Sequence, residues 1–270
     1  MISMTPLLFV ILLAVVESAV IPTDDTDNRI LGGDDVHIAE FPTMAYMFVA
    51  ANDGLVQSGH RCAATIISER WVLTAGHCVE GVLPENVILK VGNHYKNHGL
   101  FHQASRIIIH EEFILEKESD NVVDVQNDIA LVEVEEALPL NALTVKAAIL
   151  ASQNEDIPPG ISVTAVGWGR IGEYTTTDYL KKASMLTMSI WLCKYYYGPQ
   201  TSIDTRNVCA IDPQEGRHTC AGDSGGPLFD GNVVVGVTSI GRDPCIRVRR
   251  PTVFTNVAYF RDWITQRTGI

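Results

Sequence analysis

The sequence predicts an all-β fold, built either from β-barrels or from a β-sandwich. Short runs of β-branched or alternating apolar residues recur along the chain, and Gly, Pro, Asn or Asp bound each run. Helical periodicity is scarce by comparison. The 270 residues, 46% of them hydrophobic, suit one large β domain or two small ones. The expected strands include residues 63–67, 87–91, 107–109, 129–134, 163–166 and 233–237.

Three kinds of local pattern add to these strands. Asp230-Gly231 stands between two strand-like runs and predicts a hairpin turn. Residues 189–197 and 257–266 are the expected helices, and apolar residues recur at helical spacing in the second. Residues 153–160 (QNEDIPPG) are polar and Pro-rich, and we expect them to link two halves of the chain.

The N-terminus predicts a signal peptide over residues 1–19. Residues 7–16 (LLFVILLAVV) form an uncharged apolar run of ten. A membrane span needs about 20 such residues. Small residues follow at Ser18 and Ala19, as signal peptidase requires, although the α-amino group is the only positive charge ahead of the run. The alternative is a buried core segment; we favour export and an extracellular, secreted location.

A short polar stretch, residues 20–29, follows the signal. Four of its last six residues are charged and it has little apolar surface, so we expect it to be disordered and removable. Arg29 ends the stretch, and Ile30-Leu31-Gly32-Gly33 comes directly after it. A basic residue followed by an aliphatic residue and two glycines predicts a cleavable junction with a flexible new end.

The expected export of the chain bears on the state of its cysteines. An even number of cysteines in a chain bound for an oxidising compartment predicts disulfides. Six cysteines allow 15 pairings, and spacing alone does not choose among them. A zinc site is the alternative, but no pair has the C-x₂₋₄-C spacing. The cysteines are Cys62, Cys78, Cys193, Cys209, Cys220 and Cys245.

The net charge of −12 argues against nucleic acid as a partner. An acidic surface repels phosphate backbones. We also expect no membrane association of the mature chain, no metal and no cofactor.

Three short sequences carry the chemistry. Residues 74–78 (TAGHC) contain His77 after a strand-like run, and residues 127–131 (NDIAL) open another strand with Asp128. Taken singly, a His beside a Cys and an Asp at a strand start are more often structural. The third, residues 222–227 (GDSGGP), is far more specific, because the glycines around Ser224 allow a sharp turn that exposes its hydroxyl.

These three sequences, in the order His, Asp, Ser, resemble the chymotrypsin–trypsin family of serine peptidases. The resemblance covers residues 30–270, the expected peptidase domain. It implies two antiparallel six-stranded β-barrels, at about 30–140 and 150–256, and a C-terminal α-helix at about 257–267. It also implies an endopeptidase that acts on protein or peptide substrates, of the elastase- or chymotrypsin-like kind.

The resemblance assigns roles to the matching residues. Ser224 would be the nucleophile, His77 its general base, and Asp128 the group that orients His77. The backbone N–H groups of Gly222 and Ser224 would form the oxyanion hole. Ser239 matches the family serine that supports the triad aspartate.

The resemblance also implies a latent precursor. Cleavage after Arg29 would free the Ile30 ammonium, which would then pair with Asp223 beside the nucleophile. The implied disulfides are Cys62–Cys78, Cys193–Cys209 and Cys220–Cys245.

The primary specificity pocket departs from the trypsin-like pattern. His218 stands where trypsin-like members have an aspartate, so we expect no preference for Lys or Arg. Gly241 is retained, but Thr252 replaces the second wall glycine and should fill part of the pocket. Thr219 and Ser239 complete the expected pocket, and we favour small or medium apolar side chains before the cut.

An acidic side chain, held by His218 with Arg217 or Arg242, is the alternative. It requires His218 to be charged while His77 is neutral, which few molecules satisfy at pH 8 for an unperturbed pKa of about 6.5. A non-tryptic pocket also means that a separate trypsin-like protease must cut after Arg29.

His94, His98 and His102 recur every four residues, a spacing that suits metal ligands on a helix. They lie in a Gly- and Asn-containing stretch that the family makes a surface loop, so we expect solvated side chains there rather than a zinc site.

The alternative function is a catalytically weak homologue that acts as a secreted binding protein. Such homologues usually lose the serine or the histidine, and this chain keeps both. We expect a monomer, with protein protease inhibitors as further partners.

Overall fold

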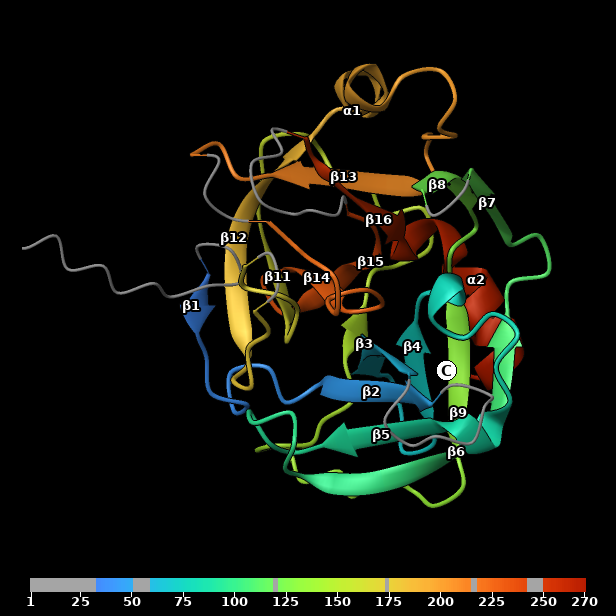
Figure 1. Ribbon diagram of the computed structural model, residues 1–270, viewed down its shortest axis with the longest axis vertical. Coiled ribbons are helices and arrows are strands. Elements are labelled where there is room, and N and C mark those ends of the chain that lie inside the picture. The colour runs from blue at the N-terminus through green and yellow to red at the C-terminus, as the bar shows by residue number, and fades with distance from the viewer. Residues whose placement is uncertain (1–32, 51–58, 119–120, 173–174, 215–217, 242–249) are drawn as a thin grey trace, which may run out of the picture.

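The computed structural model describes residues 33–50, 59–118, 121–172, 175–214, 218–241 and 250–270. Two six-stranded antiparallel β-barrels form the molecule, and Figure 1 shows one above the other, with α2 along the side. The predicted all-β class and the two barrels with a C-terminal helix are therefore confirmed.

The first barrel closes from six strands between residues 44 and 134. In order around the barrel they are β2 (Met44–Ala50), β3 (Gly59–Ile66), β4 (Trp71–Thr74), β9 (Ala130–Val134), β6 (Leu100–Ile109) and β5 (Val87–Val91). β5 alternates between buried and half-buried residues, as a strand with one face on a core should. Two short 3₁₀ turns, η1 (Gly76–Cys78) and η2 (Pro84–Asn86), lie between β4 and β5.

The second barrel closes because β13 pairs with both β16 and β12. In order its strands are β12 (Lys181–Met188), β11 (Ser162–Gly167), β14 (Pro227–Asp230), β15 (Val233–Ile240), β16 (Thr252–Asn256) and β13 (Asn207–Ile211). β1 (Asp34–Asp35) and β10 (Ile149–Leu150) add to its edges. The expected turn at Asp230-Gly231 joins β14 to β15, with Gly231 at a φ of 56°.

A third, small sheet pairs with neither barrel. It is the hairpin of β7 (Ile114–Glu118) and β8 (Asn121–Gln126), which directly precedes Asp128 in the chain. Residues 153–160 lie between β10 and β11 and contain no helix or strand.

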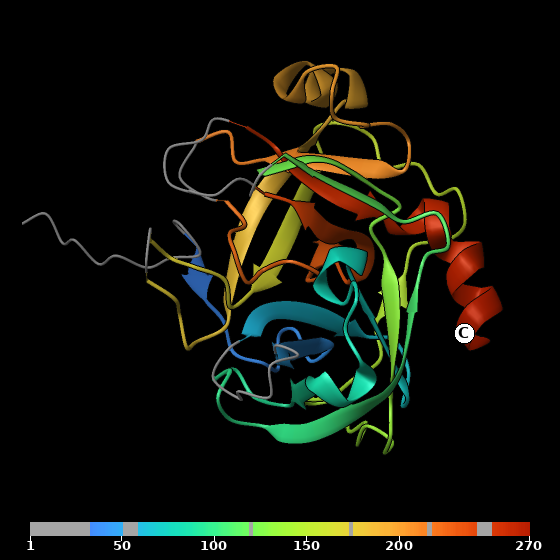
Figure 2. The same cartoon turned by 45° about the vertical axis from the view of Figure 1, so that its right-hand side comes forward.

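Both expected helices are present, and each has a side-chain N-cap. α1 (Ile190–Tyr197) begins where the Ser189 hydroxyl accepts from Leu192 N, and it projects from the second barrel in both views (Figures 1 and 2). α2 (Val257–Thr268) begins at Asn256 and packs against β15 and β10. Neither helix, nor any other in the described residues, is long and apolar enough to cross a membrane.

Most buried apolar side chains belong to one continuous core that runs through both barrels. Leu73 and Leu131 belong to its part in the first barrel, and Val237 and Phe254 belong to its part in the second. All four side chains are fully buried. Loops emerging from the two barrels therefore start from a rigid common base, which is what positions the site.

Candidate active site

Strand pairing brings His77 and Asp128 together, although they are 51 residues apart in sequence. β4 leads directly into η1, which carries His77, and Asp128 stands two residues before β9. β4 and β9 are antiparallel neighbours with Thr74 opposite Ala130. The end of one strand therefore faces the start of the other, and the two side chains meet.

The Asp128 carboxylate holds His77 at two points. Oδ2 lies 2.7 Å from Nδ1 of the ring, and Oδ1 accepts from the His77 backbone N–H at 2.8 Å. Asp128 is 2% exposed, so the contact is shielded from solvent. The ring is thereby fixed with Nδ1 toward the carboxylate and Nε2 on the side of Cys78.

Each of these groups shifts the pKa of the other. Burial by itself lowers the pKa of His77, but the charge and hydrogen bond of Asp128 outweigh burial and raise it above its usual value. Burial likewise tends to raise the pKa of Asp128, while His77 and the hydroxyl of Ser239 bring it below the usual range. The pair therefore favours a carboxylate beside an imidazole that readily accepts a proton.

Two hydroxyls from the second barrel support Asp128. Ser239 Oγ donates to Oδ2 at 2.6 Å, and Thr255 Oγ1 donates to the Asp128 backbone carbonyl at 2.7 Å. Ser239 was expected here, whereas Thr255 was missed because a threonine inside a strand carries no local signal of such a contact. Asp128 thus reaches across from the first barrel into the second.

Ser224 lies in the turn just before β14. Its carbonyl accepts from Ala63 N at 2.8 Å, and the next residue, Gly225, donates to Thr238 O at 2.8 Å. Gly225 has a φ of +77°, and a Cβ there would lie 2.1 Å from Thr74 Oγ1. Only glycine fits, because the turn packs directly against the first barrel.

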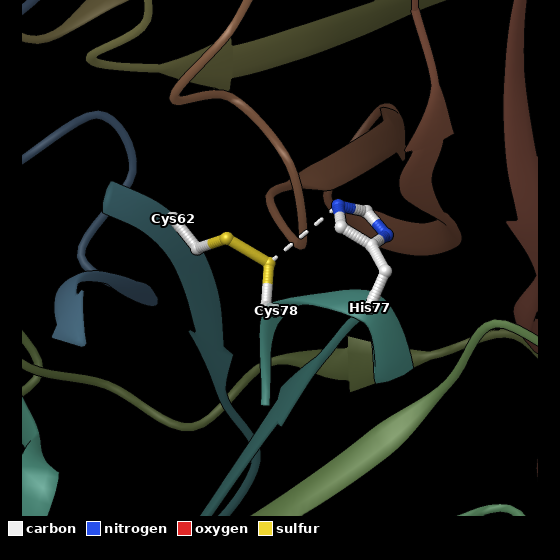
Figure 3. A group of neighbouring side chains, drawn as sticks. All are labelled: Cys62, His77 and Cys78. Carbon is white, nitrogen blue, oxygen red and sulfur yellow. Dashed lines mark hydrogen bonds between the residues drawn. A yellow bond between two sulfur atoms is a disulfide. The ribbon is translucent and has the colours of Figure 1, made fainter. Parts of the chain in front are cut away.

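His77 and Ser224 line one cavity of about 240 Å³. No hydrogen bond joins the two side chains in the described structure; instead His77 Nε2 faces Cys78 Sγ at 3.8 Å (Figure 3). Catalytic hydrogen bonds are often long or misaligned without substrate and tighten when it binds.

Figure 3 also explains the cluster of Cys62, His77 and Cys78, the group of potential metal ligands that stands out among the described residues. The two sulfurs form the disulfide Cys62–Cys78 and are therefore not thiolates. His77 is already held by Asp128. The cluster is a disulfide beside a histidine, not a metal centre.

Two backbone amides in the turn around Ser224 are free to bind an anion. Within the described structure, the N–H groups of Gly222 and Ser224 donate to no protein acceptor, whereas those of Asp223, Gly225 and Gly226 each do. Gly222 has a φ of +102°. An oxyanion hole needs backbone donors of this kind, unused and close to the serine hydroxyl.

Asp223 is buried beneath this turn at 1% exposure. Its Oδ1 accepts from Gly169 N at 2.7 Å and its Oδ2 from Cys220 N at 2.9 Å. Burial raises the pKa of Asp223 to about 6, although the two backbone hydrogen bonds act in the opposite direction. No cation pairs with it among the residues that the structure describes.

The expected pocket residues occupy different positions around the cavity. Thr219, Ser239 and Gly241 line it. Thr252 stands behind Thr219, with the two hydroxyl oxygens 3.0 Å apart, and His218 is buried at 8% exposure; neither lines the cavity. The Thr219 hydroxyl of the cavity wall is therefore held by a buried hydroxyl that does not itself reach the cavity.

The β7–β8 hairpin contributes cavity residues that the sequence analysis missed. Leu115, Lys117 and Val125 line the cavity beside His77. They belong to no recognised motif, and the only sequence signal is that β8 ends two residues before Asp128.

Some expected features lie outside the described residues: the signal peptide and pro-segment, Arg29, Ile30, Arg217, Arg242 and Cys245. Cys193–Cys209 is present, and Cys220 is disulfide-bonded.

The expectation for the three spaced histidines is partly wrong. His98 is exposed, but His102 belongs to β6 and is only 9% exposed, with both ring nitrogens buried and without a hydrogen-bond partner. His94 packs against the rings of His37 and Tyr179 at centroid distances of 4.4 and 4.6 Å. Pairing of β5 with β6 extends further into this stretch than its Gly and Asn content indicates.

Comparison with known proteins agrees with this geometry. The Trypsin family profile matches residues 30–264. The vitellin-degrading protease of Bombyx mori is 30% identical over 89% of this chain and 86% of its own length. The trypsin of Phaedon cochleariae is 31% identical over 90% of this chain and 89% of its own, and the brachyurin of Leptuca pugilator is 31% identical over 89% and 99%.

Solved structures give the same fold. HL collagenase superposes with a TM-score of 0.75 at 28% identity, covering 88% of this chain and 98% of that one. The scabies mite inactivated protease paralogue S-D1 also reaches a TM-score of 0.75, at 23% identity over 88% and 97% of the two chains, which supports the fold alone. Sequence match, barrel architecture and site geometry together place this chain in the trypsin family, the chymotrypsin/trypsin-like serine endopeptidases.

Proposed function

We propose that this chain is an active, secreted serine endopeptidase that cuts peptide bonds through an acyl-enzyme. The observation that carries the proposal is the Asp128–His77 contact of 2.7 Å inside a cavity that Ser224 also lines. A serine hydroxyl is a weak nucleophile near neutral pH and needs a base within reach. His77 takes the Ser224 proton during attack and returns it to the leaving amine, while Asp128 stabilises the imidazolium.

The free amides of Gly222 and Ser224 receive the charge that develops on the scissile carbonyl oxygen. Their N–H groups already lack protein acceptors, so they do not have to break a hydrogen bond to bind it. Loss of one such donor costs about 3–4 kcal/mol of barrier in comparable sites.

The chain is made as a zymogen with a signal peptide (1–19), a pro-segment (20–29) and a peptidase domain (30–270). Asp223 supports this proposal, because a buried carboxylate with a pKa raised to about 6 is costly at neutral pH without a cation. The ammonium of Ile30, freed by cleavage after Arg29, would supply that cation. A separate trypsin-like protease makes the cut.

The pocket accepts small or medium apolar side chains. Thr252 supports this preference, because its hydroxyl pairs with that of Thr219 in the cavity wall, where a glycine would leave more room. His218 is buried and does not line the cavity, which argues against an acidic side chain held by His218.

The Cys62–Cys78 and Cys193–Cys209 disulfides suit an extracellular location, since disulfides persist in oxidising compartments. We propose that the mature enzyme is a monomer acting on protein or peptide substrates, and that protein protease inhibitors bind the same cavity.

Activation and active-site labelling test the proposal. The secreted precursor is cut after Arg29 with trypsin, trypsin is removed, and a fluorophosphonate probe is added. We expect labelling of Ser224 only after the cut, none in Ser224→Ala, and strongly reduced labelling in His77→Ala. Asp223→Asn should be secreted normally but lose most activity.

Two outcomes contradict parts of this proposal. Absence of labelling in the cleaved chain, with its fold intact by circular dichroism, favours the alternative of a secreted binding protein. A fully active Asp223→Asn variant contradicts the activation mechanism but leaves the peptidase activity standing.

A peptide library varied at the residue before the cut tests the pocket. We expect Ala or Val to be preferred over Phe, Lys and Glu in the wild type. Thr252→Gly should admit larger side chains, because it removes the hydroxyl and methyl behind Thr219, whereas Thr252→Ser should keep the wild-type order. A wild-type preference for Lys, or an unchanged order in Thr252→Gly, contradicts the pocket assignment.

A further inference from the structure

The β7–β8 hairpin forms a wall of the catalytic cavity that the proposed reaction leaves unused. Leu115 and Val125 are directly opposed across the two strands, and both side chains belong to the cavity lining. Lys117 follows Leu115 across a β-bulge and lines the same cavity. An apolar wall with a cation at its end thus stands beside His77.

The hairpin is anchored to the loop between α1 and β13, so this wall has a defined position. Asp124 of β8 is 5% exposed and accepts from Ser202 N at 2.7 Å and from Ser202 Oγ at 2.8 Å. Gln126 Nε2 donates to the same carboxylate at 2.8 Å. Asp124 is therefore occupied by structural contacts and is not available to neutralise Lys117.

Lys117 is exposed and has no counter-ion among the described residues. Within the described part of the chain it makes no ion pair, while the protein as a whole has a net charge of −12. Its charge lowers the pKa of His77, as burial does, whereas the charges of Asp128 and Glu80 raise it. A cation at this position destabilises the imidazolium that forms on His77 during attack. An anion bound beside Lys117 would reduce this charge repulsion.

Strand geometry indicates which substrate side chain reaches the wall. Successive side chains of an extended peptide point to opposite sides. When the residue before the cut enters the cavity past Thr219 and Gly241, the preceding residue points the other way, toward His77 and the hairpin.

We propose that Lys117 is a specificity-determining residue that selects an acidic side chain, glutamate above all, at the second residue before the scissile bond. The inference rests on the proposed endopeptidase function. Leu115 and Val125 pack against the methylene groups of the glutamate, and its carboxylate pairs with the Lys117 ammonium. The substrate class is therefore an acidic peptide segment with a small apolar residue at the cut.

Matched peptides test the proposal with the enzyme activated by cleavage after Arg29. All carry Ala before the cut and Glu, Gln, Ala or Lys at the second position. Exposed ion pairs contribute up to about 1 kcal/mol, so we expect kcat/KM for Glu to exceed that for Gln by about threefold to fivefold at low salt. The ratio should fall toward one at about 1 M salt, where the Debye length is about 3 Å.

Variants assign the preference to this residue. Lys117→Met should bring the Glu/Gln ratio to about one, and Lys117→Glu should favour the Lys peptide instead. Lys194→Met, on the exposed face of α1, removes the same charge elsewhere and should keep the wild-type ratio. The acid limb of the pH profile on the Ala peptide should also move to higher pH in Lys117→Met, a change that a merely structural role would not produce.

Three outcomes overturn the inference: equal rates for Glu and Gln peptides, a Glu preference that survives in Lys117→Met, or a preference for acid only when it is moved to the third or fourth position. Failure of the activated wild type to cleave any peptide, including the Ala peptide, is a different result. It overturns the proposed function, and this inference with it.

Discussion

Ser239 Oγ donates to Asp128 Oδ2 at 2.6 Å, the same oxygen that faces His77 Nδ1 at 2.7 Å. One carboxylate oxygen therefore receives a donor from each barrel. The contact joins residues 111 positions apart, and through it a residue of the second barrel stabilises the ionised form of Asp128.

Removal of the Ser239 hydroxyl should weaken catalysis without abolishing it. A hydrogen bond to a charged group contributes about 1.5–3 kcal/mol, and Asp128 keeps its other donors in Ser239→Ala. We expect kcat/KM to fall on the order of tenfold. Ser184→Ala, at an exposed position of β12, is the control and should leave the rate unchanged. A wild-type rate in Ser239→Ala, measured with the Ala peptide, contradicts this account.

The pH dependence of the activated enzyme should report the raised pKa of His77. His77 acts as a base only when neutral, so kcat/KM should rise with pH through a midpoint above the usual histidine value of 6.5. Asp128→Asn removes the charge that raises this pKa and leaves burial, which lowers it. The midpoint should then shift below 6.5, with a loss of rate on the order of 10⁴-fold.

His98→Gln serves as the control for that titration, because His98 is exposed and does not line the cavity. Its profile should superpose on that of the wild type. An acid limb that stays in place in Asp128→Asn would mean that another group is titrating.

Asp223 should make the uncleaved precursor less stable as the pH rises. Its pKa is about 6 in the fold, against 3.8 for an unperturbed carboxyl, so the folded state binds the proton more tightly. The stability that this group contributes is complete below about pH 3.8 and is lost as the pH rises through about 6. A shift of about two units corresponds to about 3 kcal/mol.

Urea denaturation at pH 4 and pH 7 measures this effect, with Ser224→Ala as background to prevent self-digestion. The free energy of unfolding of the Asp223→Asn precursor, relative to the background, should rise by about 2 kcal/mol between the two pH values, because part of the effect is already present at pH 4. A difference that does not change with pH means that Asp223 is paired or solvated in the precursor.

Gly225 should tolerate no side chain, whereas Gly231 should. Both have positive φ, but a Cβ at Gly225 meets Thr74 Oγ1 at 2.1 Å and Ala63 O at 2.4 Å, and a Cβ at Gly231 meets nothing within 4 Å. Gly231→Ala should cost about 1–2 kcal/mol for the left-handed backbone alone. Gly225→Ala should cost about 4 kcal/mol or more, since backbone must move.

The urea midpoints of the two alanine variants, again in the Ser224→Ala background, compare these costs directly. Equal midpoints would mean that the turn at Ser224 does not pack tightly against the first barrel.

Local patterns were enough for the fold class and for most elements. Alternating apolar residues at 87–91 and 163–166 became β5 and β11, and Ser189 became the N-cap of α1. These features depend on backbone propensity and on side-chain spacing, both of which act over a few residues. The turn around Ser224 was readable for the same reason, since its glycines permit only certain conformations.

Local patterns failed where strand pairing overrode them. His102 lies in a Gly- and Asn-containing stretch, yet it became part of β6 because β5 offers a hydrogen-bonding partner for that segment. Propensity is a weak guide when a neighbouring strand supplies the backbone hydrogen bonds.

By itself, the sequence determined the identity and order of His77, Asp128 and Ser224 and the local turn that exposes Ser224. Only the tertiary structure decided that Thr255 supports Asp128, that Thr252 stands behind Thr219, and that Lys117 faces the cavity. Each of these contacts joins residues far apart in the chain or depends on the register of two strands. They arise from how the barrels pack, and no local pattern records that packing.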